Sequence, residues 1–335
     1  MVVLADIQSS NVQIATSLPE GMVALFVGAT SGIGEATLKQ FAMHAARPRV
    51  YFVGRKQEAA NRIIAECETL NPEGKYIFIS ADVSLLCNVD EVCRHIKDKE
   101  RALNLLVLTP GIATIHNETP EGLRKITSLL YFARMRFIVN LLPLLQQATS
   151  LRRVITVGAA GSEGPIDTAD FEGRKLSAPL FRGHITSLTT VALETLAEKA
   201  PTVSFINTHP GAVRTGITRE VDNLRMWIVW LALLLFGRWI CIPAIESGER
   251  HLFVATSAKY LARDGDDGVP LSEGVAVARG VDGEVGEGVY SVTSDGESSD
   301  NAIEVLKGLR EMGIGEIVWR YTESQFKRIT GVNAV

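Results

Sequence analysis

The stretch Gly28-Ala29-Thr30-Ser31-Gly32-Ile33-Gly34 decides the fold of this chain. The apolar run Met22–Val27 precedes it and the helix-like Glu35–Ala46 follows it. A strand that enters a glycine-rich turn and then a helix presents free N–H groups and a positive dipole end to a phosphate. The pattern predicts a dinucleotide-binding turn, although a glycine-rich turn without a ligand has the same spacing. The residues expected against the pyrophosphate are Gly28, Thr30, Ser31, Gly32, Ile33 and Gly34.

Composition narrows the class of protein. The 335 residues are 46% hydrophobic and carry a net charge of −4, which favours a large core and gives no electrostatic case for nucleic acid. The four cysteines form no CxxC pair and the six histidines form no HExxH, so neither a disulfide framework nor a metal site is predicted. These features indicate small-molecule chemistry in a reducing, cytoplasmic compartment.

The rest of the chain alternates strands and helices. Parallel strands need crossover connections, so this order predicts an α/β fold with a doubly wound, Rossmann-like parallel sheet and helices on both faces. The further strands are expected at Arg49–Val53, Lys75–Ile79, Leu103–Leu108, Arg153–Val157 and Thr202–Ile206, and the helices at Gln57–Leu70, Leu85–Arg101, Pro120–Thr149 and Arg182–Lys199.

Three segments are expected. Residues 1–20 lack the basic start and continuous apolar core of a signal peptide, and we expect a surface extension there. Residues 21–260 form the Rossmann-like domain, with an apolar lid at 220–243. Residues 261–335 form a C-terminal extension in which glycines separate short strands, Gly288–Val292 closes the sheet, and Asn301–Met312 and Glu316–Ile329 form two helices.

Four motifs in sequence order resemble the short-chain dehydrogenase/reductase family. They are the glycine turn, Asp82 after the third strand, Pro110-Gly111 after the fourth, and the run from His209 to Thr215 after the sixth. The resemblance covers residues 20–260 and implies a single cofactor site along these loops. It implies that Asp82 and Val83 face the adenine, and that the other cofactor contacts come from Gly111, Pro210, Gly211, Val213 and Thr215.

The end of the second strand indicates which cofactor is used. An acid there would accept from a free ribose 2′-OH, whereas a cation suits a 2′-phosphate. This chain has Gly54-Arg55-Lys56 and no acid. The guanidinium of Arg55 matches phosphate geometry, so NADP is favoured over NAD. The alternative is that Arg55 is a solvated loop cation.

The catalytic positions depart from the family pattern. The family uses a tyrosine acid, a lysine, a serine and an asparagine, but this chain contains no YxxxK motif. Aligned on Leu196-Ala197-Glu198, the tyrosine position falls at Arg182 and the lysine position at Thr186. Ala159 and Leu130 occupy the serine and asparagine positions.

A reductase without these groups needs a substitute, since positioned acid catalysis is worth about 10²–10⁴-fold. Arg182 would stabilise an alkoxide, His184 would act as an acid near neutral pH, and Thr186 would bond to ribose. Ser162 and Tyr131 are further candidates. Each also has an ordinary structural alternative.

The run Met226–Phe236 contains eleven uninterrupted apolar residues, fewer than the roughly 20 that span a membrane. We therefore expect no spanning segment here. Because the run follows the motif from His209 to Thr215, where the family has its substrate lid, we expect a lid over a hydrophobic small-molecule substrate. A buried helix, a subunit contact in a homo-oligomer, and peripheral membrane contact remain as alternatives.

Residues Arg182-Gly183-His184 and Glu246–His251, with the extension, look like a divergent branch found in fungal natural-product pathways. That likeness implies a polyketide, terpenoid or alkaloid intermediate as substrate. The resulting hypothesis is an NADP-dependent carbonyl reductase or alcohol dehydrogenase of secondary metabolism. The alternatives are a non-redox isomerase, dehydratase or cyclase, and a non-catalytic NADP-binding protein.

Overall fold

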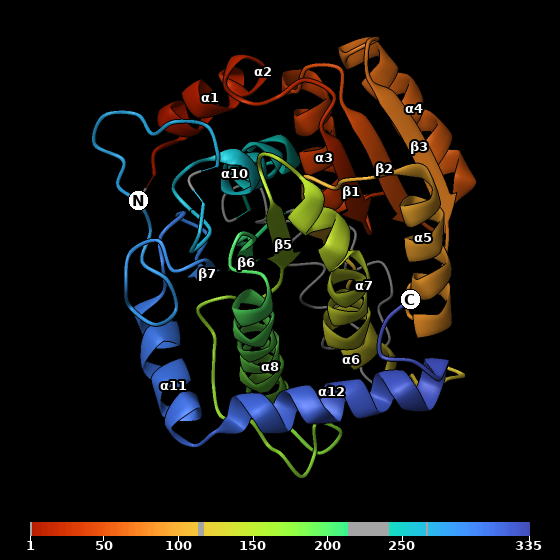
Figure 1. The fold of residues 1–335 in the computed structure, drawn as a ribbon, viewed down its shortest axis with the longest axis vertical. Helices are drawn as coiled ribbons and strands as arrows, with labels where there is room; N and C mark the ends of the chain where they lie inside the picture. Colours follow the sequence, from red (N-terminus) through yellow and green to blue (C-terminus); the bar gives the residue numbers. More distant parts are fainter. Residues whose placement is uncertain (1, 113–116, 214–240, 266) are drawn as a thin grey trace.

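The computed structural model describes residues 2–112, 117–213, 241–265 and 267–335, which form a doubly wound parallel sheet with helices on both faces (Figure 1). The strands are β1 (Val23–Val27), β2 (Arg49–Gly54), β3 (Lys75–Ser80), β4 (Leu105–Leu108), β5 (Arg153–Val157), β6 (Ser204–Thr208) and β7 (Val289–Val292). Within the described residues the sheet has seven strands in the order β3-β2-β1-β4-β5-β6-β7. The order reverses between β1 and β4, where sheets of this type hold ligands beyond the carboxyl ends of their strands.

Neighbouring strands pair in parallel throughout the sheet. All five residues of β1 are buried, which requires a covering layer on each face. The strand β3 pairs on one side only, and its end residues Lys75 and Ser80 are exposed. The predicted fold class is confirmed.

Each face of the sheet has its own apolar core. One core lies beneath α1 (Leu4–Val12), α2 (Ile14–Ser17), α3 (Gly32–His44), α4 (Gln57–Leu70) and α10 (Ala244–Thr256). The other lies beneath α5 (Leu86–Lys99), α6 (Lys125–Thr127), the π-helical turn η1 (Ser128–Phe132), α7 (Ala133–Gln147), α8 (Ala178–Lys199), α11 (Asp300–Glu311) and α12 (Ile314–Thr330).

Residues 2–20 form the helices α1 and α2, which keep part of their side chains exposed and bury the rest against the domain. The side chains of Ile7 and Ile14 are buried in the core beneath α3 and α10. The Asn11 side-chain amide donates to the carbonyl of Glu249 at 3.0 Å, which ties α1 to α10. The apolar residues of this segment are too widely spaced to stand out in the sequence, although together they cover one face of the domain.

The C-terminal extension completes the domain. The closing strand and both terminal helices are confirmed, and α12 crosses the ends of α7 and α8 (Figure 1). The described part of residues 261–287 contains isolated bridges rather than the short strands predicted from its glycines, such as Ser257 with Val269 and Arg279 with Val285. The helix α8 starts at Ala178 rather than Arg182, since Pro179 is well suited to a first helical turn.

One helical run in the described chain, residues 125–147, would be long and apolar enough to cross a membrane, but most of its apolar window is buried inside the protein. Core helices commonly share this composition. The predicted lid, including Met226–Phe236, lies outside the described residues except for 241–243.

Candidate active site

The glycine turn packs directly against the end of β4. Gly28 has φ +80°, and a Cβ at this residue would lie 2.8 Å from the backbone nitrogen of Pro110. A Cβ at Gly34 would lie 2.5 Å from Thr109 Oγ1. The Thr109 hydroxyl donates to the carbonyl of Val27 at 2.9 Å, so this threonine joins the ends of β1 and β4. Only glycine fits these two positions.

The first turn of α3 is open to a ligand. The helix begins at Gly32, and its cap residue Ser31 makes no side-chain capping bond. The first N–H groups of a helix need a partner, and together with the helix dipole they suit a phosphate. The glycine positions and the uncapped start of α3 are compatible with a phosphate site, and the contacts of the turn with a nucleotide stay a prediction.

A cavity of about 600 Å³ lies beside the carboxyl ends of β2 and β3. Arg55 and Asp82 both line it, so the structure brings together the two residues predicted at the adenosine end. Burial alone would raise the pKa of Asp82, but hydrogen bonds from Ser84 and the charges of Lys125 and Arg55 lower it. Val83 is instead buried in the core. The helix α5 adds three polar residues that the sequence did not single out, namely Asn88, Glu91 and His95.

Arg182 joins three segments at the carboxyl edge of the sheet. Its Nε donates to Ser162 Oγ at 3.2 Å, and its Nη2 donates to His209 Nε2 at 3.2 Å. Burial and the charge of Arg182 lower the pKa of His209, so the ring is a neutral acceptor. Arg182 is exposed at the start of α8, where it can meet a ligand.

His184 and Thr186 face the protein interior. His184 Nδ1 accepts from the backbone N–H of Asp167 at 3.1 Å, and Nε2 donates to the carbonyl of Phe171 at 3.0 Å. Both ring nitrogens are thus used, and burial lowers the pKa of this histidine. Thr186 donates to the carbonyl of Arg182 at 2.7 Å and is buried. The geometry favours the structural alternative for both residues.

Tyr131 and Leu130, at two further candidate positions, also have structural roles. Tyr131 is buried, and its hydroxyl lies 2.6 Å from Thr322 Oγ1 of α12, so it is a core residue. Leu130, at the asparagine position, faces Gly111, since a Cβ at Gly111 would lie 3.4 Å from Leu130 Cδ2.

The loop after β6 carries the other predicted cofactor contacts. Gly211 has φ +72° and packs on Ser294. Pro210 precedes it, Val213 forms a parallel bridge with Ile242, and Thr215 lies outside the described residues.

Arg134 lies beside the loop after β4 and was not singled out in the sequence. It is buried in α7, and its Nη2 donates to the carbonyl of Pro110 at 2.8 Å, directly after β4. In the sequence, Arg134 is distinguished only as an arginine between apolar residues of a predicted helix. Arg136, two residues later, has the same surroundings, so the pattern does not single out Arg134.

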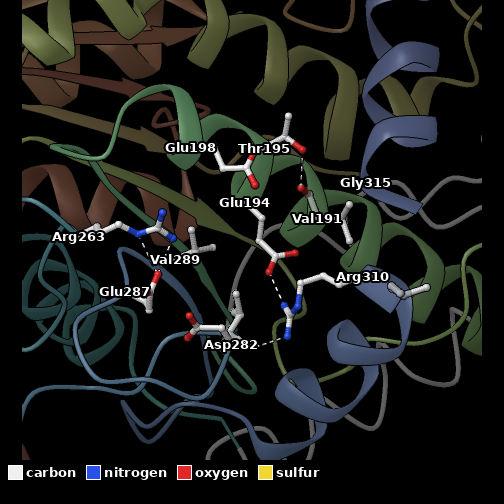
Figure 2. Close-up of a pocket in the computed structure, with 12 residues that line it drawn as sticks. Val191, Glu194, Thr195, Glu198, Arg263, Asp282, Glu287, Val289, Arg310 and Gly315 are labelled. Atoms are coloured by element: carbon white, nitrogen blue, oxygen red, sulfur yellow. Dashed lines mark hydrogen bonds and ion pairs between the residues drawn. The ribbon is translucent and has the colours of Figure 1, made fainter. Parts of the chain in front are cut away.

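A second cavity, of about 230 Å³, lies away from this edge, between the second half of α8, the start of β7 and α11 (Figure 2). Glu194 pairs with Arg310 across it, and Asp282 lies beside them. Burial raises the pKa of Glu194 to about 7, although Arg310 opposes the shift. This cavity is remote from the glycine turn and is not the cofactor site.

The reversal in strand order, the open helix α3 and the glycine turn define a dinucleotide-binding protein of the Rossmann class. More specifically, the chain belongs to the short-chain dehydrogenase family, whose profile, described as short chain dehydrogenase, matches residues 22–225. This is an oxidoreductase family, as the sequence resemblance implies.

The chain is 41% identical over 335 residues to Oxidoreductase AN1596 of Emericella nidulans, covering 97% of this chain and 98% of that relative. It is 25% identical over 252 residues to the mouse polyprenol dehydrogenase, covering 72% and 73%. Among solved structures, L-sorbose reductase from Gluconobacter frateurii, complexed with NADPH and L-sorbose, superposes with a TM-score of 0.55 at 17% identity, covering 78% of this chain and 98% of that chain. The last likeness concerns the fold alone.

Proposed function

We propose that this oxidoreductase uses NADP(H) to interconvert a carbonyl and an alcohol on a bulky hydrophobic metabolite. The observation that carries the proposal is the position of Arg55 in the cavity at the ends of β2 and β3, next to the open glycine turn. A guanidinium there matches a 2′-phosphate, whereas an NAD-specific site would place an acid at this point. Gly28, Thr30 and Gly32 to Gly34 would hold the diphosphate.

We propose Arg182 as the group that stabilises the substrate oxygen. When bound, the nucleotide would supply a hydride to the carbonyl carbon, and negative charge would develop on the substrate oxygen. Arg182 is exposed at the carboxyl edge of the sheet, and Ser162 and His209 hold its guanidinium in place. Donors fixed in advance toward a developing oxyanion are a large term in catalysis. Thr186 donates to the carbonyl of Arg182 within α8, and His184 holds the loop from Asp167 to Phe171.

A hydrophobic substrate is supported by two facts. The run Met226–Phe236 is continuously apolar in the sequence, at the place where the family has its substrate lid. The polyprenol dehydrogenase relative is named for a lipophilic alcohol. The Emericella nidulans relative is named only as an oxidoreductase, so the proposed substrate class, a fungal secondary-metabolite intermediate, rests on the sequence resemblance.

The test is to incubate the protein with NADPH and a series of lipophilic ketones and aldehydes, and to follow NADPH absorbance and product together. Equal consumption of NADPH and carbonyl supports the proposal. Conversion of a substrate without nucleotide turnover would instead support the isomerase, dehydratase or cyclase alternative, which the loss of the tyrosine and lysine favours. Nucleotide binding without any conversion across a broad series would support a non-catalytic NADP-binding protein.

A further inference from the structure

Arg134 carries a buried positive charge that no carboxylate in the described residues neutralises. Its side chain is 2% exposed. Nη2 donates to Pro110 O at 2.8 Å and Nε donates to Leu129 O at 3.3 Å, both neutral carbonyls. Nη1 makes no hydrogen bond within the described part of the chain. Burial of a charge is costly unless it is paired, so this guanidinium needs an explanation.

Two other buried arginines show how the chain normally handles such a charge. Arg136, two residues later, donates to both oxygens of Asp90 at 2.6 and 2.7 Å. Arg153 forms no ion pair with a carboxylate among the described residues, although the charge of Asp267 acts on it, and its two terminal nitrogens donate to four carbonyls at the amino end of β5. Arg134 has neither arrangement. Burial lowers the pKa of Arg134 to about 10, so the group is still charged at neutral pH.

The position of Arg134 explains what the charge can act on. Nη1 lies 3.7 Å from the point that a Cβ at Gly158 would occupy, directly after β5, while Pro110 directly follows β4. A dinucleotide in this fold places one half on each side of the switch point between β1 and β4. Arg55 marks the adenosine half beyond β1. The nicotinamide half then lies over β4 to β6, beside Arg134.

We propose that Arg134 is a charged residue of the active site that biases it toward reduction. An unneutralised guanidinium favours the neutral ring of NADPH over the cationic ring of NADP⁺, and it favours negative charge on the substrate oxygen. In the reduction, hydride moves from the reduced ring to the carbonyl carbon. The C=O π pair becomes the lone pair of an alkoxide, which then takes a proton from water. The products are an alcohol and NADP⁺.

This inference rests on the proposed function, because it needs a nicotinamide nucleotide in the crevice. At an effective dielectric near 20, a unit charge several ångströms away changes binding by roughly 10–100-fold. The wild-type protein is therefore expected to bind NADPH at least about 10-fold more tightly than NADP⁺. Arg134→Met should remove most of this ratio, and Arg134→Lys should keep a large part of it.

The experiment measures dissociation constants for NADPH and NADP⁺ by calorimetry on the full-length wild type and on Arg134→Met and Arg134→Lys. Arg320→Met is the matched control, since Arg320 is an exposed arginine of α12 paired with Glu316. It should leave the ratio unchanged. Turnover with a carbonyl substrate should fall in Arg134→Met more than in Arg134→Lys, with KM changing less than kcat.

Different failures have different meanings. A wild type that binds neither nucleotide overturns the proposed function itself. A wild type that binds NADP⁺ as tightly as NADPH overturns the Arg134 inference alone, and this outcome requires no variant to fold. A folded Arg134→Met protein with the wild-type ratio also overturns it, because the arginine would then only hold Pro110 in place.

Discussion

At the scale of single residues, we propose that Arg55 sets the preference for NADPH over NADH. A charge-assisted hydrogen bond to the 2′-phosphate contributes about 1.5–3 kcal/mol. We therefore expect Arg55→Ala to weaken NADPH binding by roughly 10–100-fold and to leave NADH binding almost unchanged. Calorimetry with both nucleotides measures this, and Lys56→Ala is the neighbouring control. Equal wild-type affinities for NADPH and NADH would rule out the proposal.

Arg182 and His184 lie two residues apart and should behave oppositely. Arg182→Ala is expected to lower kcat while NADPH affinity stays nearly constant, since it removes an interaction made mainly in the transition state. His184→Ala removes two hydrogen bonds of a buried side chain and should lower the free energy of unfolding by about 1–3 kcal/mol. Kinetics, calorimetry and urea unfolding on both variants separate the two roles. A stable but inactive His184→Ala would return this histidine to the catalytic candidates.

His251 predicts a pH dependence of stability. It is buried in α10, Nδ1 donates to the carbonyl of Ser247 at 2.6 Å, and Nε2 has no partner in the described chain. Burial lowers the pKa of His251 from 6.5 to about 4. The unfolded chain therefore takes up a proton that the folded protein does not, so stability falls as the pH falls from 6.5 toward 4.

The full effect of this shift is roughly 3 kcal/mol. His251→Phe keeps an aromatic ring of similar size and cannot titrate. Urea unfolding between pH 7 and 4 should show a smaller loss of stability in this variant than in the wild type. Parallel curves for the two proteins would show that His251 does not carry the effect.

At the scale of helices and strands, local patterns predicted most elements. The strands β2 and β5 and the helix α4 are found nearly where their apolar spacing places them, because each is a continuous apolar run or an amphipathic face. The helices α1 and α2 are not apparent in the sequence, since contacts of α1 with α10, which is distant in sequence, stabilise this segment. Helices in proteins derive most of their stability from such packing.

Two helical glycines give a matched pair of predictions. A Cβ at Gly248 of α10 would lie 2.8 Å from the backbone of Ala36 in α3, whereas a Cβ at Gly308 of α11 would meet nothing within 4 Å. Gly248→Ala should force α10 away from α3 and lower the melting temperature. Gly308→Ala should stabilise the protein by about 0.5–1 kcal/mol, because alanine loses less backbone entropy in a helix.

Thermal unfolding of the two glycine variants checks this difference. The close approach at Gly248 lets α10 pack on α3 at Ala36, one turn after the helix begins at Gly32. A stabilised Gly248→Ala would contradict the close packing of these helices.

At the scale of the whole molecule, sequence motifs indicate where the proposed cofactor residues gather, but they do not indicate the contacts of the candidate catalytic residues. Gly28, Arg55 and Asp82 belong to short motifs at strand ends, and the topology of the sheet brings strand ends together without further information. The contacts of Arg182 with His209, and of Arg134 with Pro110, join segments far apart in the chain. The sequence also does not reveal whether a buried arginine has a carboxylate partner. Arg136 donates to Asp90, whereas Arg134 donates to the carbonyl of Pro110.

The C-terminal extension should unfold together with the dinucleotide-binding part as one cooperative unit. Phe326 of α12 is fully buried, and the guanidinium of Arg136 lies 5.0 Å from the centre of its ring. Arg136 also donates to Asp90 of α5 and to the carbonyl of Val332 near the C-terminus, so one arginine joins both parts of the chain. Truncating Phe326 would open a cavity at the junction between the extension and the dinucleotide-binding part.

Phe326→Ala is therefore expected to lower the free energy of unfolding by about 3–5 kcal/mol, the usual cost of truncating a buried phenylalanine. Met312→Ala is the control, because Met312 is 63% exposed and its loss should change stability by less than about 0.5 kcal/mol. Urea unfolding followed by tryptophan fluorescence and by far-ultraviolet circular dichroism should give coincident transitions in both variants. An early separate transition in Phe326→Ala, with the sheet still folded and NADPH still bound, would show that the extension is an independent unit.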